Sequence, residues 1–234
     1  MELDLRDFSP FRRPRTPMAG ALNLSLNGTV KATAVEDKWN FWVFSISARG
    51  RLNGEKSRKS NSINGNVSVN RTTPESKLRL GFSGNFDESR YDYEDYESTS
   101  RSESRNFDGL YVKSLGEHWS VGAFVNLNHT TYGNINYGLS VHPAVEYNLF
   151  PYAESTRHQL RFLYRIGYNW DRYLERTVYG KTEDKVLNQA LTMTLEFTEP
   201  WGNAEVSVEG SNYFLENFKY YRFRISGNFS VRIV

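Results

Sequence analysis

Apolar and polar side chains alternate with a period of two along most of the chain from residue 39 onward. The stretch 159–173 shows the pattern most clearly, because large apolar residues occupy every second position and two arginines and an amide lie between them. A period of two places these two sets on opposite faces of an extended strand. The stretch exceeds the roughly 9–11 residues that a tilted strand needs to cross a bilayer, whereas strands of soluble proteins usually have about 5–6. The pattern therefore predicts a membrane-crossing strand.

The same alternation predicts ten strands. We expect them at residues 39–53, about 60–72, 77–87, about 105–114, 119–131, 136–148, 159–173, 187–198, 203–213 and 220–234. Residues 88–104 and 174–185 are predicted to be polar loops, and Pro143 is expected to cause a bulge or a local break because it lacks an amide donor. Connections after the second, fourth and eighth strands are short, and those after the first, third and seventh are longer, which is typical of the two rims of an outer-membrane barrel.

The expected fold class is all-β, an antiparallel up-and-down transmembrane β-barrel over residues 39–234. Residues 1–38 are polar and proline-containing, and are expected to form a separate N-terminal extension, periplasmic or the remnant of a longer segment. The alternation runs into Ile233 and Val234. The barrel therefore either closes at ten strands, an allowed even number, or needs further strands to avoid open edges in lipid.

Charged residues fall on the parity opposite to the apolar set. An arginine facing lipid near the bilayer centre costs about 2–4 kcal/mol, so this segregation predicts that the charges point into the barrel. We expect Arg161 opposite Glu146 and Glu196, and Glu209 facing Arg224. The predicted inward network comprises Arg49, Arg79, Glu146, Arg161, Arg165, Glu196, Glu205, Glu209, Arg222 and Arg224. The predicted lipid-facing aromatic residues are Trp42, Phe44, Phe162, Tyr164, Trp170, Phe223 and Phe229.

The composition agrees with this interpretation and argues against nucleic acid as a partner. Aromatic residues make up 15% of the chain although hydrophobic residues make up only 38%, and the mean hydropathy is −0.63. A barrel with a polar interior needs apolar residues at only half of its strand positions. The net charge of +2 gives no field that would attract nucleic acid, and the absence of cysteine excludes disulfides. Residues 1–20 lack the apolar segment of a secretion signal, which an exported protein requires.

The sequence contains two weaker candidate sites, one catalytic and one that could bind a metal ion. Ser140, His142 and Glu146 share one face of a predicted strand and loosely suggest a barrel hydrolase, but successive members lie about 6–7 Å apart or more, so we expect no catalytic set. The acidic, tyrosine-containing segment between residues 87 and 97 lacks the glycine and the spacing of a calcium loop. We therefore expect no metal and no cofactor. The acidic residues of that segment are Asp87, Glu88, Asp92, Glu94, Asp95 and Glu97.

Several short motifs resemble those of a known family. They are Trp39–Phe44 (WNFWVF), Val112–Leu115 (VKSL) before His118–Ser120 (HWS), Glu146–Tyr152 (EYNLFPY), Glu154–Arg157 (ESTR), Pro200–Gly202 (PWG) and Glu209–Tyr213 (EGSNY). In combination, over roughly residues 39–234, they resemble an uncharacterised group of Gram-negative outer-membrane β-barrel proteins of about twelve strands. The resemblance implies a longer parent with a secretion signal, a periplasmic N-terminal part and about two more strands, so that the chain is truncated at both ends. It implies fold and location, and no activity.

The sequence thus predicts an outer-membrane β-barrel with a structural or passive, porin-like transport role and no enzymatic activity. Its inward charges either select solutes in a pore or fill a narrow barrel with ion pairs, and we favour filling. The expected partners are outer-membrane lipid, lipopolysaccharide and the barrel-assembly machinery. Two alternatives are a barrel hydrolase acting at the external rim and a soluble β-barrel that binds an apolar ligand.

Overall fold

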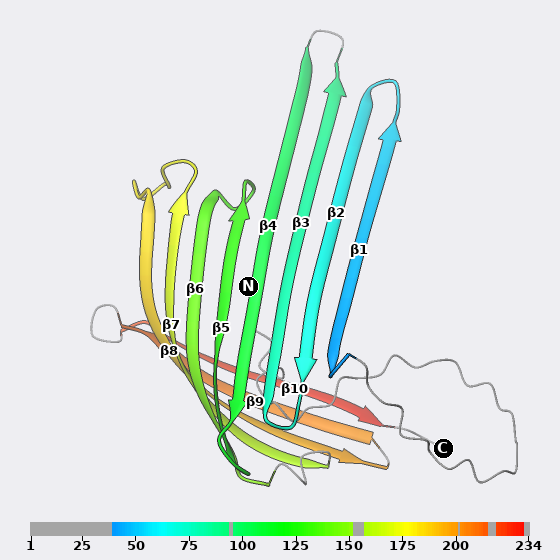
Figure 1. The fold of residues 1–234 in the computed structure, drawn as a ribbon. Coiled ribbons are helices and arrows are strands. Elements are labelled where there is room, and N and C mark those ends of the chain that lie inside the picture. Colours follow the sequence, from blue (N-terminus) through cyan, green and yellow to red (C-terminus); the bar gives the residue numbers. More distant parts are fainter. Residues whose placement is uncertain (1–38, 94–95, 152–156, 201, 215–218, 232–234) are drawn as a thin grey trace, which may run out of the picture.

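The computed structural model describes residues 39–93, 96–151, 157–200, 202–214 and 219–231. Ten strands form one antiparallel sheet in chain order (Figure 1). They are β1 (Trp42–Gly54), β2 (Arg58–Thr72), β3 (Ser76–Asp92), β4 (Glu97–Ser114), β5 (Trp119–Thr130), β6 (Ile135–Asn148), β7 (His158–Tyr173), β8 (Glu183–Glu199), β9 (Gly202–Tyr213) and β10 (Tyr221–Val231). The extension predicted at residues 1–38, and Glu94 and Asp95 of the acidic segment, lie outside the described residues.

The expected all-β, antiparallel up-and-down arrangement is confirmed. Each strand pairs with its neighbours in sequence, and among the described residues β1 and β10 do not pair with each other, so the sheet is open. β1 to β4 stand side by side and rise beyond β5 to β8, while β8 to β10 sweep across the lower part of the curled sheet (Figure 1). No helix in the described ranges is long and apolar enough to cross a membrane.

The prediction of a loop at residues 88–104 is wrong. β3 continues to Asp92 and β4 begins at Glu97, so most of this segment is a paired ribbon. Glu88 lies opposite Arg101 in the register, and Arg101 Nε donates a hydrogen bond to Glu88 Oε2 at 2.6 Å. Cross-strand pairs of opposite charge and a complete backbone ladder stabilise this polar ribbon. We call the upper part of β1–β4, residues 47–66, 83–93 and 96–106, the arm; above Ser104, which lies opposite Thr130 of β5, it rises beyond the other strands.

The predicted difference between the two rims is only partly right. The lower rim carries the short connections 73–75, 115–118 and 200–201, but also the longer connection 149–157. The upper rim carries the longer connections 174–182 and 214–220, but only residues 55–57, 93–96 and 131–134 separate the other pairs of strands there. The expected loops after the first and third strands are absent because the strands themselves extend further.

Of the bulge or local break expected at Pro143, the structure shows a local break. The pairing of Pro143 with Ala123 on β5 is regular, whereas the pairs with β7 stop at Val141 and resume at Ala144 in the same register. Proline has no amide donor, which explains an interrupted ladder on one side of the strand. The register shift in this region lies near Ile135, at the upper end of β6.

Candidate functional site

The register separates the sheet into two chemically different faces. In one row, Ser120, Glu146, Leu163, Thr192, Glu209 and Arg224 lie side by side from β5 to β10. The neighbouring row, on the other side of the pleat, contains Val121, Val145, Tyr164, Leu191, Gly210 and Phe223. We call the first the inner face and the second the outer face. Apart from the register shift near Ile135, consecutive pairing keeps each face continuous across the sheet.

The outer face is apolar and exposed. Ile46, Phe223 and Phe229 are 78%, 64% and 71% exposed. All seven aromatic residues predicted to face lipid lie on this face: Trp42, Phe44, Phe162, Tyr164, Trp170, Phe223 and Phe229. Because monomeric soluble proteins rarely expose a continuous apolar surface of this extent, the outer face needs a partner or an apolar medium.

Aromatic residues border the outer face at both rims. At the lower rim the rings of Trp119 and Tyr147 are 4.8 Å apart, and at the upper rim the rings of Tyr137 and Trp170 meet edge to face at 5.6 Å. Beyond the apolar band at the upper rim, hydrogen bonds from Lys185 and from the indole of Trp170 lower the pKa of Glu183. The rings therefore lie where the surface changes from apolar to charged, as interfacial aromatic residues do in membrane barrels.

The first charge cluster of the inner face is formed by Glu146, Arg161 and Glu196. Arg161 Nη1 lies 3.8 Å from Glu146 Oε2, and Arg161 Nη2 lies 3.8 Å from Glu196 Oε2. The expected direct pairing is wrong, since Asn148 and Thr194 lie opposite Arg161 and the long arginine side chain reaches both carboxylates diagonally. Glu146 is 1% exposed and Arg161 is 3% exposed. These charges are therefore removed from water and compensate one another.

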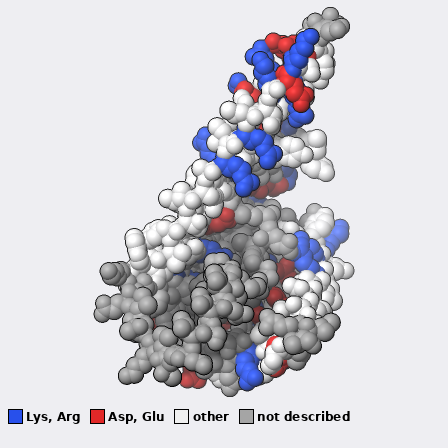
Figure 2. Space-filling view, turned by 90° about the vertical axis from the view of Figure 1, so that its right-hand side faces the viewer, with Lys and Arg blue, Asp and Glu red and all other residues white. Residues whose placement is uncertain are grey.

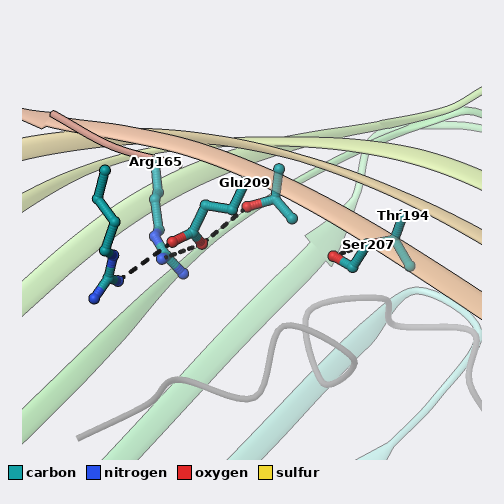
Figure 3. A network of polar contacts seen from close by, with 6 residues as sticks. Arg165, Thr194, Ser207 and Glu209 are labelled. Atoms are coloured by element: carbon teal, nitrogen blue, oxygen red, sulfur yellow. Dashed lines mark hydrogen bonds and ion pairs between the residues drawn. The ribbon is translucent and has the colours of Figure 1, made fainter. Parts of the chain in front are cut away.

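The second charge cluster is centred on Glu209 of β9 (Figure 3). Arg165 Nη2 donates a hydrogen bond to Glu209 Oε2 at 2.8 Å, and Thr192 Oγ1 donates to the same oxygen at 3.2 Å. Arg222 Nη2 lies 3.6 Å from Glu209 Oε1. The side chain of Arg165 starts on β7 and reaches past β8. The residue opposite Arg165 on β8 is the small Ala190. A charge-assisted hydrogen bond of this kind is stronger than one between neutral groups.

The remaining predicted inward charges lie outside these clusters. Arg224 is directly opposite Glu209 in the register, as expected, and Glu205 is directly opposite Glu196. Arg79 lies beside Leu110 on β4, and Arg49 lies on the exposed edge strand β1. The ten predicted charges therefore share one face of the sheet, and five of them form the two clusters: Glu146, Arg161, Glu196, Arg165 and Glu209, with Arg222 as a peripheral member of the second.

The inner face also contains an apolar cluster that the sequence analysis missed. Leu110, Val112, Phe124 and Leu163 are buried together on β4, β5 and β7, with Ala144 against them. Their signal in the sequence was the presence of large apolar residues at inward-facing positions of β4, β5 and β7. Part of the interior is thus packed as in a soluble core.

Ser140, His142 and Glu146 do not form a catalytic arrangement in the described structure. The three side chains follow one another on the inner face of β6, and no hydrogen bond joins any two of them among the described residues. The ring of His142 instead lies over Gly167, where an added Cβ would come within 2.5 Å of His142 Nε2 and 2.0 Å of Asn188 Oδ1. His142 therefore fills the space that the glycine of the neighbouring strand leaves.

Across the described ranges, no three His, Asp or Glu side chains come close enough together to hold a metal ion. The chain matches no family model, no curated protein and no solved structure, so the resemblance to an outer-membrane family stays a prediction, and what is shown is the antiparallel, ten-stranded fold.

Proposed function

We propose that residues 39–231 form the lipid-embedded wall of an outer-membrane β-barrel protein with a structural role. The observation that carries the proposal is the exposed apolar outer face, opposite an inner face that holds the charges. A soluble β-barrel that binds an apolar ligand would place its large apolar side chains inside, whereas here Leu191, Phe223 and Phe229 lie outside and exposed, and those inside are packed against one another. An arginine or glutamate on the lipid side would be costly, and the charged residues of both clusters lie on the inner face.

The height of the apolar band supports the same proposal. On β6 the lower-rim Tyr147 lies ten residues beyond the upper-rim Tyr137. Ten residues at about 3.3 Å each extend over about 33 Å. A strand tilt of about 40° reduces this length to a height of about 25 Å, which is the height of the apolar band of outer-membrane barrels.

A filled interior favours the structural role over free passage of solutes. Glu146, Arg161 and the apolar cluster around Phe124 are almost inaccessible to water. Small barrels are filled by their own side chains in this way. Passive transport is the second candidate, and the exposed inner-face arginines Arg49 and Arg222 favour it, because charged side chains lining a pore would select solutes by sign.

Folding into detergent micelles or lipid vesicles tests the membrane proposal. The chain is expected to fold only when they are present and to migrate differently on a denaturing gel before and after heating. Purification without detergent as a single monodisperse monomer would contradict the proposal. Planar bilayers then separate the two roles. A folded chain that carries no steady current supports the structural role, whereas a current whose ion selectivity changes on Arg222→Ala supports passive transport.

A further inference from the structure

The inner face of the arm differs in composition from the rest of the described sheet. Four successive rows across β1 to β4 bring sixteen side chains onto one surface, and none of them is buried. Eight are serines, five are asparagines, two are arginines and one is an aspartate. We call this surface the polar grid: Ser47, Asn66, Ser83 and Asn106; Arg49, Asn64, Asn85 and Ser104; Arg51, Ser62, Asp87 and Ser102; and Asn53, Ser60, Ser89 and Ser100.

Contact with water alone does not explain the polar grid. The outer face of the same strands is also exposed, but it carries large apolar residues such as Ile63 and Phe86 in its lower rows. Its upper rows carry ion pairs, Arg101 with Glu88 and Arg90 with Glu97. Figure 2 shows acidic and basic side chains gathering at the far end of the arm. Two surfaces of the same ribbons therefore differ in chemistry, with apolar side chains and paired charges on one side and mostly short polar groups on the other.

The geometry of the polar grid suits a ligand rich in hydroxyl groups. Neighbouring strands are about 4.8 Å apart and side chains on one face repeat about every 6.7 Å, so the grid is a flat lattice roughly 15 Å by 20 Å. A serine hydroxyl both donates and accepts hydrogen bonds, and an asparagine amide has two donor hydrogens and an acceptor oxygen. Short side chains also lose little rotamer entropy when a ligand covers them.

Hydrogen bonds within the polar grid orient these groups. Asn64 Nδ2 donates to Asn85 Oδ1 at 3.1 Å and to Ser62 Oγ at 3.3 Å, and Asn53 Nδ2 donates to Ser60 Oγ at 3.4 Å. Both donor hydrogens of Asn64 are thus engaged, whereas the bond of Asn53 uses one of its two donor hydrogens. Asp87 lies in the third row of the grid, where Asn85 Nδ2 donates a hydrogen bond to its carboxylate.

A tyrosine stack continues the polar grid at its upper end. Tyr91 follows Ser89 on the same face of β3, and its ring stacks on Tyr93 at 6.4 Å, which in turn stacks on Tyr96 at 4.6 Å. The guanidinium of Arg58 lies 5.3 Å from the centre of the Tyr91 ring. Tyr93 and Tyr96 are 48% and 61% exposed, so the stack offers flat apolar faces beside a hydrogen-bonding lattice.

We propose that the polar grid and the tyrosine stack of the arm bind an uncharged polysaccharide. Its hydroxyl groups match the donors and acceptors of the grid, and the apolar face of a sugar ring matches an exposed tyrosine ring. A strongly charged ligand fits less well, because only three of the sixteen grid side chains are charged and they include both signs. The proposal holds for the arm whether or not the barrel conducts solutes.

The test uses the full chain folded in detergent micelles and four fluorescent probes: maltoheptaose, cellohexaose, dextran and dextran sulfate. Wild type is expected to bind at least one of the three uncharged probes and to prefer dextran over dextran sulfate. Ser62→Arg places a long side chain across the polar grid and is expected to weaken binding about tenfold or more, since about 1.4 kcal/mol of lost contact is a factor of ten. Asn61→Arg changes the adjacent residue on the outer face and is expected to leave the affinity unchanged.

A double variant, Tyr93→Ala/Tyr96→Ala, tests the stack separately and is expected to weaken binding several-fold. Circular dichroism and gel mobility show whether each variant has folded. Three results would overturn the proposal. The first is an equal loss of affinity in Ser62→Arg and Asn61→Arg, and the second is tighter binding of dextran sulfate than of dextran by wild type. The third is that wild type binds none of the uncharged probes more strongly than Ser62→Arg does.

Discussion

Arg161 provides the sharpest test of the buried charges. Replacing it by methionine keeps most of the side-chain volume and removes the positive charge between two carboxylates, each 3.8 Å away. Glu146, a carboxylate at 1% exposure, would then lose one of the two cations that act on it, the other being Lys77, and its Oε1 atom already has no hydrogen-bond partner among the described residues. Breaking a buried pair by removing one partner costs about 3–5 kcal/mol. We expect Arg161→Met to lower the free energy of unfolding by about that amount.

The assay is equilibrium unfolding in urea of the chain folded in lipid vesicles, followed by tryptophan fluorescence. Arg101→Met is the matched control, because it removes an arginine from an ion pair with Glu88 in which the Arg101 side chain is 70% exposed. Exposed pairs contribute about 0–1 kcal/mol, so this control is expected to be nearly neutral. The double variant Arg161→Met/Glu146→Gln should recover part of the loss, since it removes the stranded charge.

Equal, small losses for Arg161→Met and Arg101→Met would refute the reasoning, because they would mean that the Arg161 cluster is as well solvated as the arm. A double variant no more stable than Arg161→Met would point to Glu196 as the uncompensated charge. If Arg161→Met does not fold, Arg161→Lys keeps the charge and should fold, which separates the electrostatic cause from a packing cause.

Three further outcomes follow from the two faces. Leu191→Arg, at the middle of the outer band, should lower the free energy of unfolding by about 2–4 kcal/mol in the same assay. Leu187→Arg, nearer the upper rim, should lower it by about 0–1 kcal/mol. Equal losses in the two variants would contradict a lipid-facing band. Gly167→Ala should destabilise by about 1–3 kcal/mol because the new methyl group overlaps the ring of His142, and Gly210→Ala, which meets nothing within 4 Å, should be neutral. Reconstituted wild type should carry no steady current across a planar bilayer, and a stable current would contradict the filled interior.

The sequence predicted the strands and their faces because both depend on local alternation. The seven aromatic residues assigned to the outer face, including Phe162 and Trp170, lie there, and the ten assigned charges share the inner face. One buried face strongly specifies register, so parity alone was enough to separate the two sets. The ten strands were predicted for the same reason. For most of them, the predicted boundaries differ by a few residues from those in the structure.

The details of the inner face could not be predicted because they depend on register offsets and side-chain reach. Arg161 lies opposite Asn148, and only the length of the arginine brings it to Glu146. Arg165 meets Glu209 across an intervening strand because the row between them holds Ala190. The polar ribbon at 88–104 was predicted as a loop because its charges pair only once the strands are aligned, as Glu88 and Arg101 do.

The most direct test of the central claim, that the outer face is in lipid, uses spin labels. The chain contains no cysteine, so single cysteines can be placed at successive positions 190 to 195 of β8 without background. In vesicles, labels replacing the outer-face residues Leu191, Met193 and Leu195 are expected to be accessible to oxygen, which concentrates in lipid, and inaccessible to a water-soluble nickel chelate. Labels at the inner-face residues Ala190, Thr192 and Thr194 are expected to be poorly accessible to oxygen. High accessibility to the nickel chelate at the outer-face positions would contradict the claim.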